Sequence, residues 1–72
     1  MSGEYMANRL KDLIEERQIS QIHIYRFHDS KLHQQSRQWQ FGHEFLEVDG
    51  WPYNLNRVVT FRVTGYILEL YF

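Results

Sequence analysis

The residues best suited to acid–base or metal chemistry in this chain are its four histidines. His23, His28 and His33 are spaced five residues apart, and His43 follows further along the chain. Imidazole titrates near neutral pH, so histidine can act as a general acid or base and can ligate metal ions. In an extended strand, however, an odd separation places His23 and His28 on opposite faces, and the spacing matches no zinc-binding pattern. We therefore predict no catalytic residue, no metal site and no cofactor. A small hydrolase or nuclease that uses His23, His28 or His43 is the third hypothesis.

The most distinctive segment covers residues 49–56, in which Trp51 and Tyr53 flank Pro52. Proline stiffens the backbone and lowers the entropy cost of presenting two amphipathic rings. Trp and Tyr are enriched among the residues that dominate protein–protein binding energy. Two arrangements are open: the Trp51 ring faces a partner, or it folds back as a lid over one end of the sheet. The residues predicted to bind a protein partner are Trp51, Tyr53, Tyr25, Phe27 and Tyr71.

An alternative use of the strand aromatics is the binding of single-stranded nucleic acid. Small sheet and barrel domains stack bases on aromatic rings that lie among basic side chains. The residues that would form such a site are Arg26, Arg37, Trp39 and Arg62. Long-range attraction does not favour this alternative, because 8 basic and 9 acidic side chains leave a net charge of −1. Such a balance produces no field that draws in a polyanion.

The length and composition predict a single folded domain over residues 1–72. Cysteine is absent, which excludes a disulfide framework and a thiolate metal site. Apolar residues make up 43% of the chain and aromatic residues 17%, as is typical of a globular protein rather than a disordered one. The sequence shows neither a secretory-signal pattern nor an apolar stretch near the ~20 residues that span a membrane. We therefore expect a cytoplasmic protein that does not bind membranes.

The elements that must position these residues begin with a helix over residues 3–17. Met6, Leu10, Leu13 and Ile14 recur at the spacing that places them on one helical face. Ser2 precedes the segment and is a favourable N-cap residue. We expect this helix to bury its apolar face against the remainder of the domain.

Beyond the helix the pattern changes to the alternation of β-strands. The polar segment 29–36 is predicted to be a loop. Asp49-Gly50 is the strongest turn signal in the chain. Strands are predicted at residues 21–28, 37–48, 57–64 and 66–72.

The strand predicted over residues 37–48 carries large apolar side chains on both of its faces. Trp39 and Phe41 fall on one face of a flat strand, whereas Leu46 and Val48 fall on the opposite face. A single core can accept all four side chains only if the chain changes direction between the two pairs. We therefore predict a bulge or sharp bend near Gly42 and His43.

The strand predicted over residues 66–72 is apolar on both faces apart from Glu69. Because such a strand would promote aggregation at a sheet edge, it must lie centrally, lie under the helix or pair with another chain. A homodimer formed through it would also enlarge a core that is small at this chain length. Short connections favour an antiparallel meander. The predicted fold class is α+β, with an N-terminal helix packed on a strongly curved, mostly antiparallel four-stranded sheet or small open barrel.

These patterns favour a small, non-enzymatic protein-binding module that acts through exposed aromatic residues. Such a module would be a regulator, adaptor or inhibitor of a larger protein partner. The alternative is a single-stranded nucleic-acid-binding domain that uses the strand aromatics and arginines. Neither hypothesis rests on a catalytic or metal-binding signature.

Overall fold

The computed structural model describes residues 2–72. Within these residues the chain forms one α-helix, seven β-strands and one short 3₁₀ helix. Their bounds are α1 (Gly3–Arg17), β1 (Gln21–Tyr25), β2 (Leu32–Ser36), β3 (Trp39–Phe41), β4 (Phe45–Val48), β5 (Trp51–Asn54), η1 (Leu55–Arg57), β6 (Thr60–Thr64) and β7 (Ile67–Tyr71).

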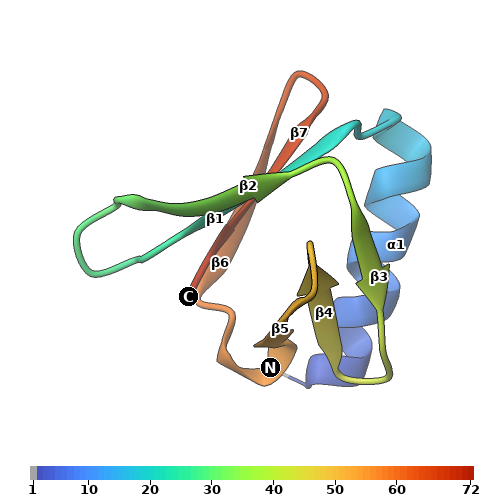
Figure 1. Ribbon diagram of the computed structural model, residues 1–72. Helices are drawn as coiled ribbons and strands as arrows, with labels where there is room; N and C mark the ends of the chain where they lie inside the picture. Colours follow the sequence, from blue (N-terminus) through green and yellow to red (C-terminus); the bar gives the residue numbers. More distant parts are fainter. Residues whose placement is uncertain (1) are drawn as a thin grey trace.

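The strands form two sheets, which confirms the predicted α+β class (Figure 1). Four strands in the order β2-β1-β7-β6 make a sheet that we call the mixed sheet, because β1 and β7 run parallel while the other pairs are antiparallel. Three strands in the order β3-β4-β5 make the antiparallel sheet. The mostly antiparallel four-stranded sheet is therefore present, and a second sheet accompanies it.

The expected antiparallel meander is wrong for the last strand. β7 lies between β1 and β6, with Ile22 opposite Leu68 and Ile24 opposite Leu70. This central position pairs both backbone edges of β7 with neighbouring strands. A strand that is apolar on both faces is thereby kept away from the edge of the sheet, where it would promote aggregation. β7 therefore has no free edge to which a strand of a second copy could be added.

α1 begins and ends where its capping residues predict. The Ser2 side chain accepts a hydrogen bond from the Tyr5 amide at 3.4 Å, and Gln18 closes the helix in the left-handed conformation with φ 52°. The Gly3 amide donates to Asn56 Oδ1 at 2.7 Å, which fixes the start of α1 to η1. A Cβ atom at Gly3 would lie 2.9 Å from the Asn56 side chain, so a larger residue here would displace the Asn56 amide.

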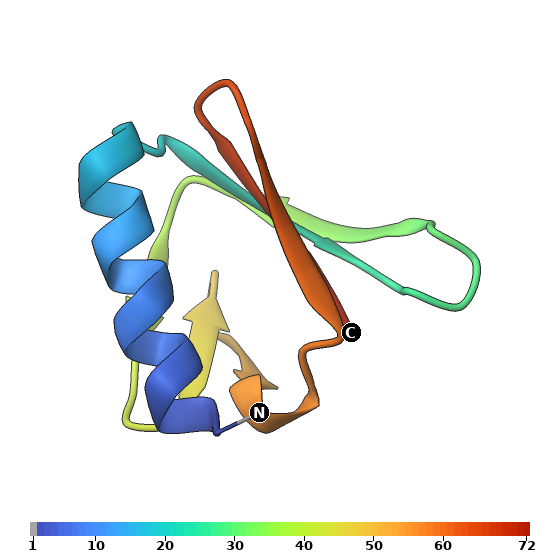
Figure 2. The same ribbon diagram turned by 180° about the vertical axis from the view of Figure 1, so that it is seen from behind.

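The hydrophobic core lies between α1 and the two sheets. Figure 2 shows α1 and the antiparallel sheet on one side of the molecule, with the β6–β7 hairpin of the mixed sheet opposite. Burying these apolar side chains supplies the main driving force for folding. The buried apolar residues are Met6, Ala7, Leu10, Leu13, Ile19, Ile22, Ile24, Leu46, Val48, Leu55, Leu68 and Leu70.

The direction change expected near Gly42 is a full reversal of the chain. The predicted strand 37–48 is two strands, β3 and β4, which pair antiparallel. The Gly42 amide donates to the Phe45 carbonyl at 2.8 Å. Trp39 lies opposite Val48 and Phe41 opposite Leu46, so both pairs face one core as the sequence requires.

Three other expectations differ from the structure in their bounds. The predicted loop 29–36 contains β2, whose polar residues pair with β1 at the edge of the mixed sheet. The predicted strand 21–28 ends at Tyr25, because residues 27–29 form a turn. The predicted strand 57–64 starts only at Thr60, because η1 ends at Arg57 and residues 58–59 connect it to β6, with Val59 exposed.

The Asp49-Gly50 turn is confirmed. Asp49 has φ 53° and Gly50 has φ 86°. Two positive φ values are what a type I′ hairpin turn requires. The turn joins β4 to β5 and places Trp51 opposite Val48. No helix among the described residues is long and apolar enough to cross a membrane.

Candidate functional site

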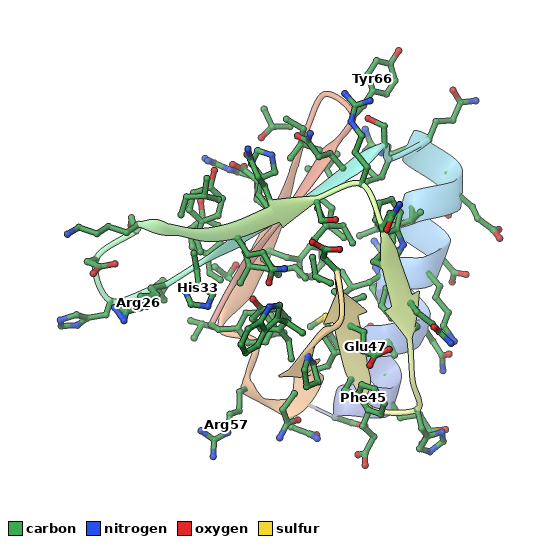
Figure 3. All side chains as sticks on the ribbon, viewed as in Figure 1. Arg26, His33, Phe45, Glu47, Arg57 and Tyr66 are labelled. Atoms are coloured by element: carbon green, nitrogen blue, oxygen red, sulfur yellow. The ribbon has the colours of Figure 1, made fainter. Side chains whose placement is uncertain are left out.

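A groove lies between strand β2 of the mixed sheet and strand β5 of the antiparallel sheet. His33, Gln34 and Trp51 line this space, which has a volume of about 340 Å³. We call it the inter-sheet groove. Figure 3 shows His33 directed from β2 toward the antiparallel sheet. The groove brings together residues from two segments that the sequence keeps apart.

Gln34 holds the two sheets together at the base of this groove. Its Nε2 donates to the Val48 carbonyl at 2.7 Å, and its Oε1 accepts a hydrogen bond from the Tyr53 hydroxyl. The Tyr53 ring also meets the edge of His33, with ring centroids 6.3 Å apart, and packs against Phe72 at 5.2 Å. Burial raises the pKa of Tyr53 above its ordinary value. Tyr53 therefore supports Gln34 and His33, two of the residues that line the groove, and its hydroxyl is already engaged.

Trp51 differs from Tyr53 because its ring is largely free. Its exposed fraction is 68%, the highest among the large apolar side chains recorded as exposed. The type I′ turn on one side and Pro52 on the other fix the backbone that carries it. The ring does not fold back as a lid over the sheet. It stands beside the inter-sheet groove on edge strand β5.

Tyr25 and Tyr71 form a second aromatic surface on the mixed sheet. They are paired across β1 and β7, and their rings stack with centroids 5.0 Å apart and planes at 16°. Burial, assisted by the nearby Glu69 carboxylate, raises the pKa of Tyr25. Phe27 lies beyond β1 with an exposed fraction of 54%, and its amide donates to the Phe72 carbonyl at 2.9 Å.

The five residues predicted to bind a partner are thus divided among separate places. Trp51 lines the inter-sheet groove and Tyr53 contacts its lining residue His33. Tyr25 and Tyr71 stack on the mixed sheet, and Phe27 lies in the turn after β1. Only Trp51 and Phe27 expose more than half of their surface. Among the five, Trp51 is the one that combines high exposure with an adjoining groove.

Glu69 is a buried charge that the sequence interpretation left without a role. It is 7% exposed and lies on β7 opposite Arg62. Its Oε1 accepts hydrogen bonds from Arg62 Nε at 2.7 Å and from Thr64 Oγ1 at 2.9 Å. The hydrogen bond from Arg62 lowers the pKa of Glu69, and the same bond raises the pKa of Arg62. A charge in an otherwise apolar central strand was the available signal for a cross-strand partner.

The residues proposed for nucleic-acid binding do not converge. Arg26 and Arg37 follow opposite ends of the antiparallel β1–β2 hairpin, and Figure 3 shows Arg26 at its outer tip. Arg62 is engaged by Glu69. Trp39 is half-buried and packs against the hydrophobic core. The structure therefore assembles no basic aromatic platform from these four side chains.

The histidines are likewise dispersed. His23 Nε2 lies 2.7 Å from Gln21 Oε1, and His43 Nε2 lies 3.5 Å from a carboxylate oxygen of Glu4 with both side chains exposed. His28 is in the exposed turn after β1, while His33 lines the inter-sheet groove. Among residues 2–72, no three His, Cys, Asp or Glu side chains are placed to hold a metal ion.

Sequence reasoning missed two contributors to the groove, His33 and Gln34. Both lie in the segment predicted to be a loop: His33 was considered there only as one of four histidines, and nothing in the sequence marked Gln34. Phe45 was also missed: it is exposed on the outer face of the antiparallel sheet, where it lines a shallow depression with Glu44, Pro52, Asn54 and Asn56. Comparison with known proteins adds nothing to this picture, because no family model, curated protein or solved structure matches the chain.

Proposed function

We propose that this chain is a non-enzymatic, cytoplasmic protein-binding module that acts as a regulator, adaptor or inhibitor of a larger protein. The proposal places the contact at the inter-sheet groove, with Trp51 as its main anchor. The observation that carries it is the exposure of the Trp51 ring, 68%, at the border of a groove whose walls are fixed. Tryptophan is one of the residue types most enriched among binding hot spots.

The rigidity of the site supports this use. Hydrogen bonds from Gln34 and Tyr53 link the two sheets below the groove, and the backbone of Trp51 is constrained by the turn and by Pro52. A preformed surface loses little conformational entropy when it binds. A partner suited to it would present an apolar side chain to the Trp51 ring and a hydrogen-bonding group to His33.

The test compares Trp51→Ala with Tyr5→Ala. Tyr5 is a matched control because it is 60% exposed and lies on α1, away from the groove. Tagged wild type and both variants are recovered from the native cell, and each co-purifying protein is then purified and titrated by calorimetry. We expect Trp51→Ala to weaken binding about 30-fold, as for a hot spot of ~2 kcal/mol, and Tyr5→Ala to leave it unchanged.

A partner whose affinity is equal for wild type and Trp51→Ala would contradict the proposal. A ligand recovered as single-stranded nucleic acid, with affinity that falls steeply as salt rises, would support the alternative hypothesis instead. Protein binding through an apolar ring should depend only weakly on ionic strength.

A further inference from the structure

The two sheets have four edge strands, and only one of them lacks features that block pairing with another chain. β5 carries Pro52, which cannot donate a backbone hydrogen bond. β2 has a register shift opposite Ile24 and Tyr25, and β3 is three residues long. Bulges, prolines and short length are the usual means of preventing edge-to-edge association. Within Thr60–Thr64, β6 has none of them; the extra contact of the Val59 amide with the Tyr71 carbonyl lies just before the strand.

β6 is a regular edge strand. Thr60–Thr64 pairs with β7 over five residues without a register shift, and it contains neither glycine nor proline. Three of its residues are β-branched, which favours strand pairing. Sheet order ends at β6, so no described strand pairs with its outer side.

The one charged residue on β6 does not shield this edge. Charged side chains commonly protect edge strands from association. Arg62, however, reaches back over β7, with Nε 2.7 Å from Glu69 Oε1 and Nη2 3.4 Å from the Tyr71 hydroxyl. Its charge is directed toward the centre of the mixed sheet and is compensated there.

The geometry of the β6–β7 hairpin identifies the free backbone groups. Gly65 and Tyr66 form a two-residue turn, and Gly65 has φ 60°. In a hairpin closed by such a turn, hydrogen-bonded and non-hydrogen-bonded pairs alternate from Thr64 and Ile67 onward. The N–H and C=O groups of Phe61 and Val63 therefore point away from β7, toward the open edge.

We propose that a second copy of this chain pairs with that edge, β6 against β6 in antiparallel orientation, about a two-fold axis at Arg62. The sequence Thr60-Phe61-Arg62-Val63-Thr64 is nearly palindromic by residue character. An antiparallel match to itself places Thr60 opposite Thr64 of the second copy and Phe61 opposite Val63 of the second copy. Thr–Thr and aromatic–β-branched pairs are both favourable across antiparallel strands.

The flanks of β6 fit the same arrangement. Val59 and Tyr66 are exposed apolar residues at its two ends. The Val59 amide donates to the Tyr71 carbonyl at 2.8 Å, so strand pairing with the second copy is confined to Thr60–Thr64, and Val59 lies near the Gly65–Tyr66 turn of that copy. The two Arg62 residues face each other at the axis, but each is already bound to its own Glu69. The association joins the two mixed sheets into one continuous sheet and is a closed, isologous contact.

The test uses charge pairs at positions 60 and 64, which are exposed and point away from the core. Thr60→Lys with Thr64→Lys places like charges opposite each other twice in the predicted register. Thr60→Glu with Thr64→Lys differs only at position 60 and places opposite charges there instead. Sedimentation equilibrium from micromolar to millimolar concentration measures the dimer dissociation constant of each, and circular dichroism verifies the fold.

We expect wild type to dimerise, the Lys–Lys variant to bind at least about tenfold more weakly than wild type, and the Glu–Lys variant to retain the dimer. A wild-type chain that stays monomeric at millimolar concentration overturns the proposal, and so do equal dissociation constants for the two double variants.

A backbone test removes one of the edge groups directly. Val63→Pro deletes an N–H that points outward, whereas Val63→Ala also changes the side chain but keeps that N–H. We expect Val63→Pro to abolish dimerisation and Val63→Ala to preserve it. Equal dimerisation of the two variants overturns the predicted hydrogen-bonding pattern. Trp51→Ala should leave the dimer unchanged, so the proposed function and the dimer are tested independently.

Discussion

Arg62 and Glu69 form an ion pair across β6 and β7, with 2.7 Å between Arg62 Nε and Glu69 Oε1. The two partners differ in environment, because the Arg62 side chain is 64% exposed and that of Glu69 is 10% exposed. Glu69 is therefore a nearly buried carboxylate whose charge is compensated from the solvent side. Burying it without such a partner would be costly.

This pairing predicts a pH-dependent contribution to stability. The pKa of Glu69 is lowered in the folded state, chiefly by the hydrogen bond from Arg62. The stabilisation is therefore complete above the ordinary carboxyl value of 4.5 and is lost as pH falls through the lower folded value. We expect Glu69→Gln to cost about 1 kcal/mol at neutral pH, since solvent around Arg62 limits the gain.

Urea unfolding of wild type and Glu69→Gln at several pH values measures this contribution. The difference in the free energy of unfolding should shrink on acidification. Glu16→Gln, on the exposed side of α1, is the control and should show no such trend. A Glu69→Gln difference that grows as pH falls would contradict the prediction.

The helix face can be tested at Leu10, which is fully buried in the core. Leu10→Ala removes buried apolar contacts and leaves a cavity, so we expect a loss of about 2–5 kcal/mol in the free energy of unfolding. The measurement is chemical denaturation, with the exposed neighbour Arg9→Ala as control. A change below ~1 kcal/mol for Leu10→Ala would refute its place in the core.

The two tryptophans should respond differently to truncation. Trp51 is largely exposed, so Trp51→Ala should leave the melting temperature nearly unchanged. Trp39 is half-buried against the core, so Trp39→Ala should lower the melting temperature clearly. The corresponding loss in the free energy of unfolding should be about 2–3 kcal/mol. Differential scanning calorimetry of both variants provides the comparison. A large drop for Trp51→Ala would show that its ring packs as a lid in solution.

Gly42 and Phe45 should be energetically coupled. A Cβ atom at Gly42 would lie 2.5 Å from the Phe45 ring, so Gly42→Ala forces that ring to move. Because Phe45 is exposed and can reorient, we expect a modest loss of about 1 kcal/mol. In the Phe45→Ala background the same substitution should cost almost nothing. A double-mutant cycle measures the coupling, and additive effects would contradict the contact.

The sequence predicted the features that depend on local signals. The helical face of Met6, Leu10 and Leu13 and the cap at Ser2 place α1 correctly, because both depend on residues within a few positions. Asp49-Gly50 likewise defines its own turn. The opposite faces of the pairs Trp39/Phe41 and Leu46/Val48 predicted a change of chain direction near Gly42. They did not predict that the chain reverses completely there.

The features that were missed depend on distant pairing. β2 contains mainly polar residues, and its strand conformation comes from pairing with β1 rather than from its own pattern. The parallel contact of Ile22 with Leu68 joins segments that are far apart in the sequence, with β2 to β6 between them. The inter-sheet groove requires both sheets to be in place, so neither Gln34 nor His33 could be assigned to it beforehand. Exposure of Trp51 could be posed only as one of two alternatives.

The central place of β7 in the mixed sheet has a consequence for how the chain reaches its native state. Until Ile67–Tyr71 emerge during synthesis, the β1–β2 hairpin has an unsatisfied inner edge, and Ile22 and Ile24 lack the neighbours that complete their burial. Pairing of β7 with β1 therefore closes a long loop, which slows folding and leaves the inner edge of the hairpin exposed until that step.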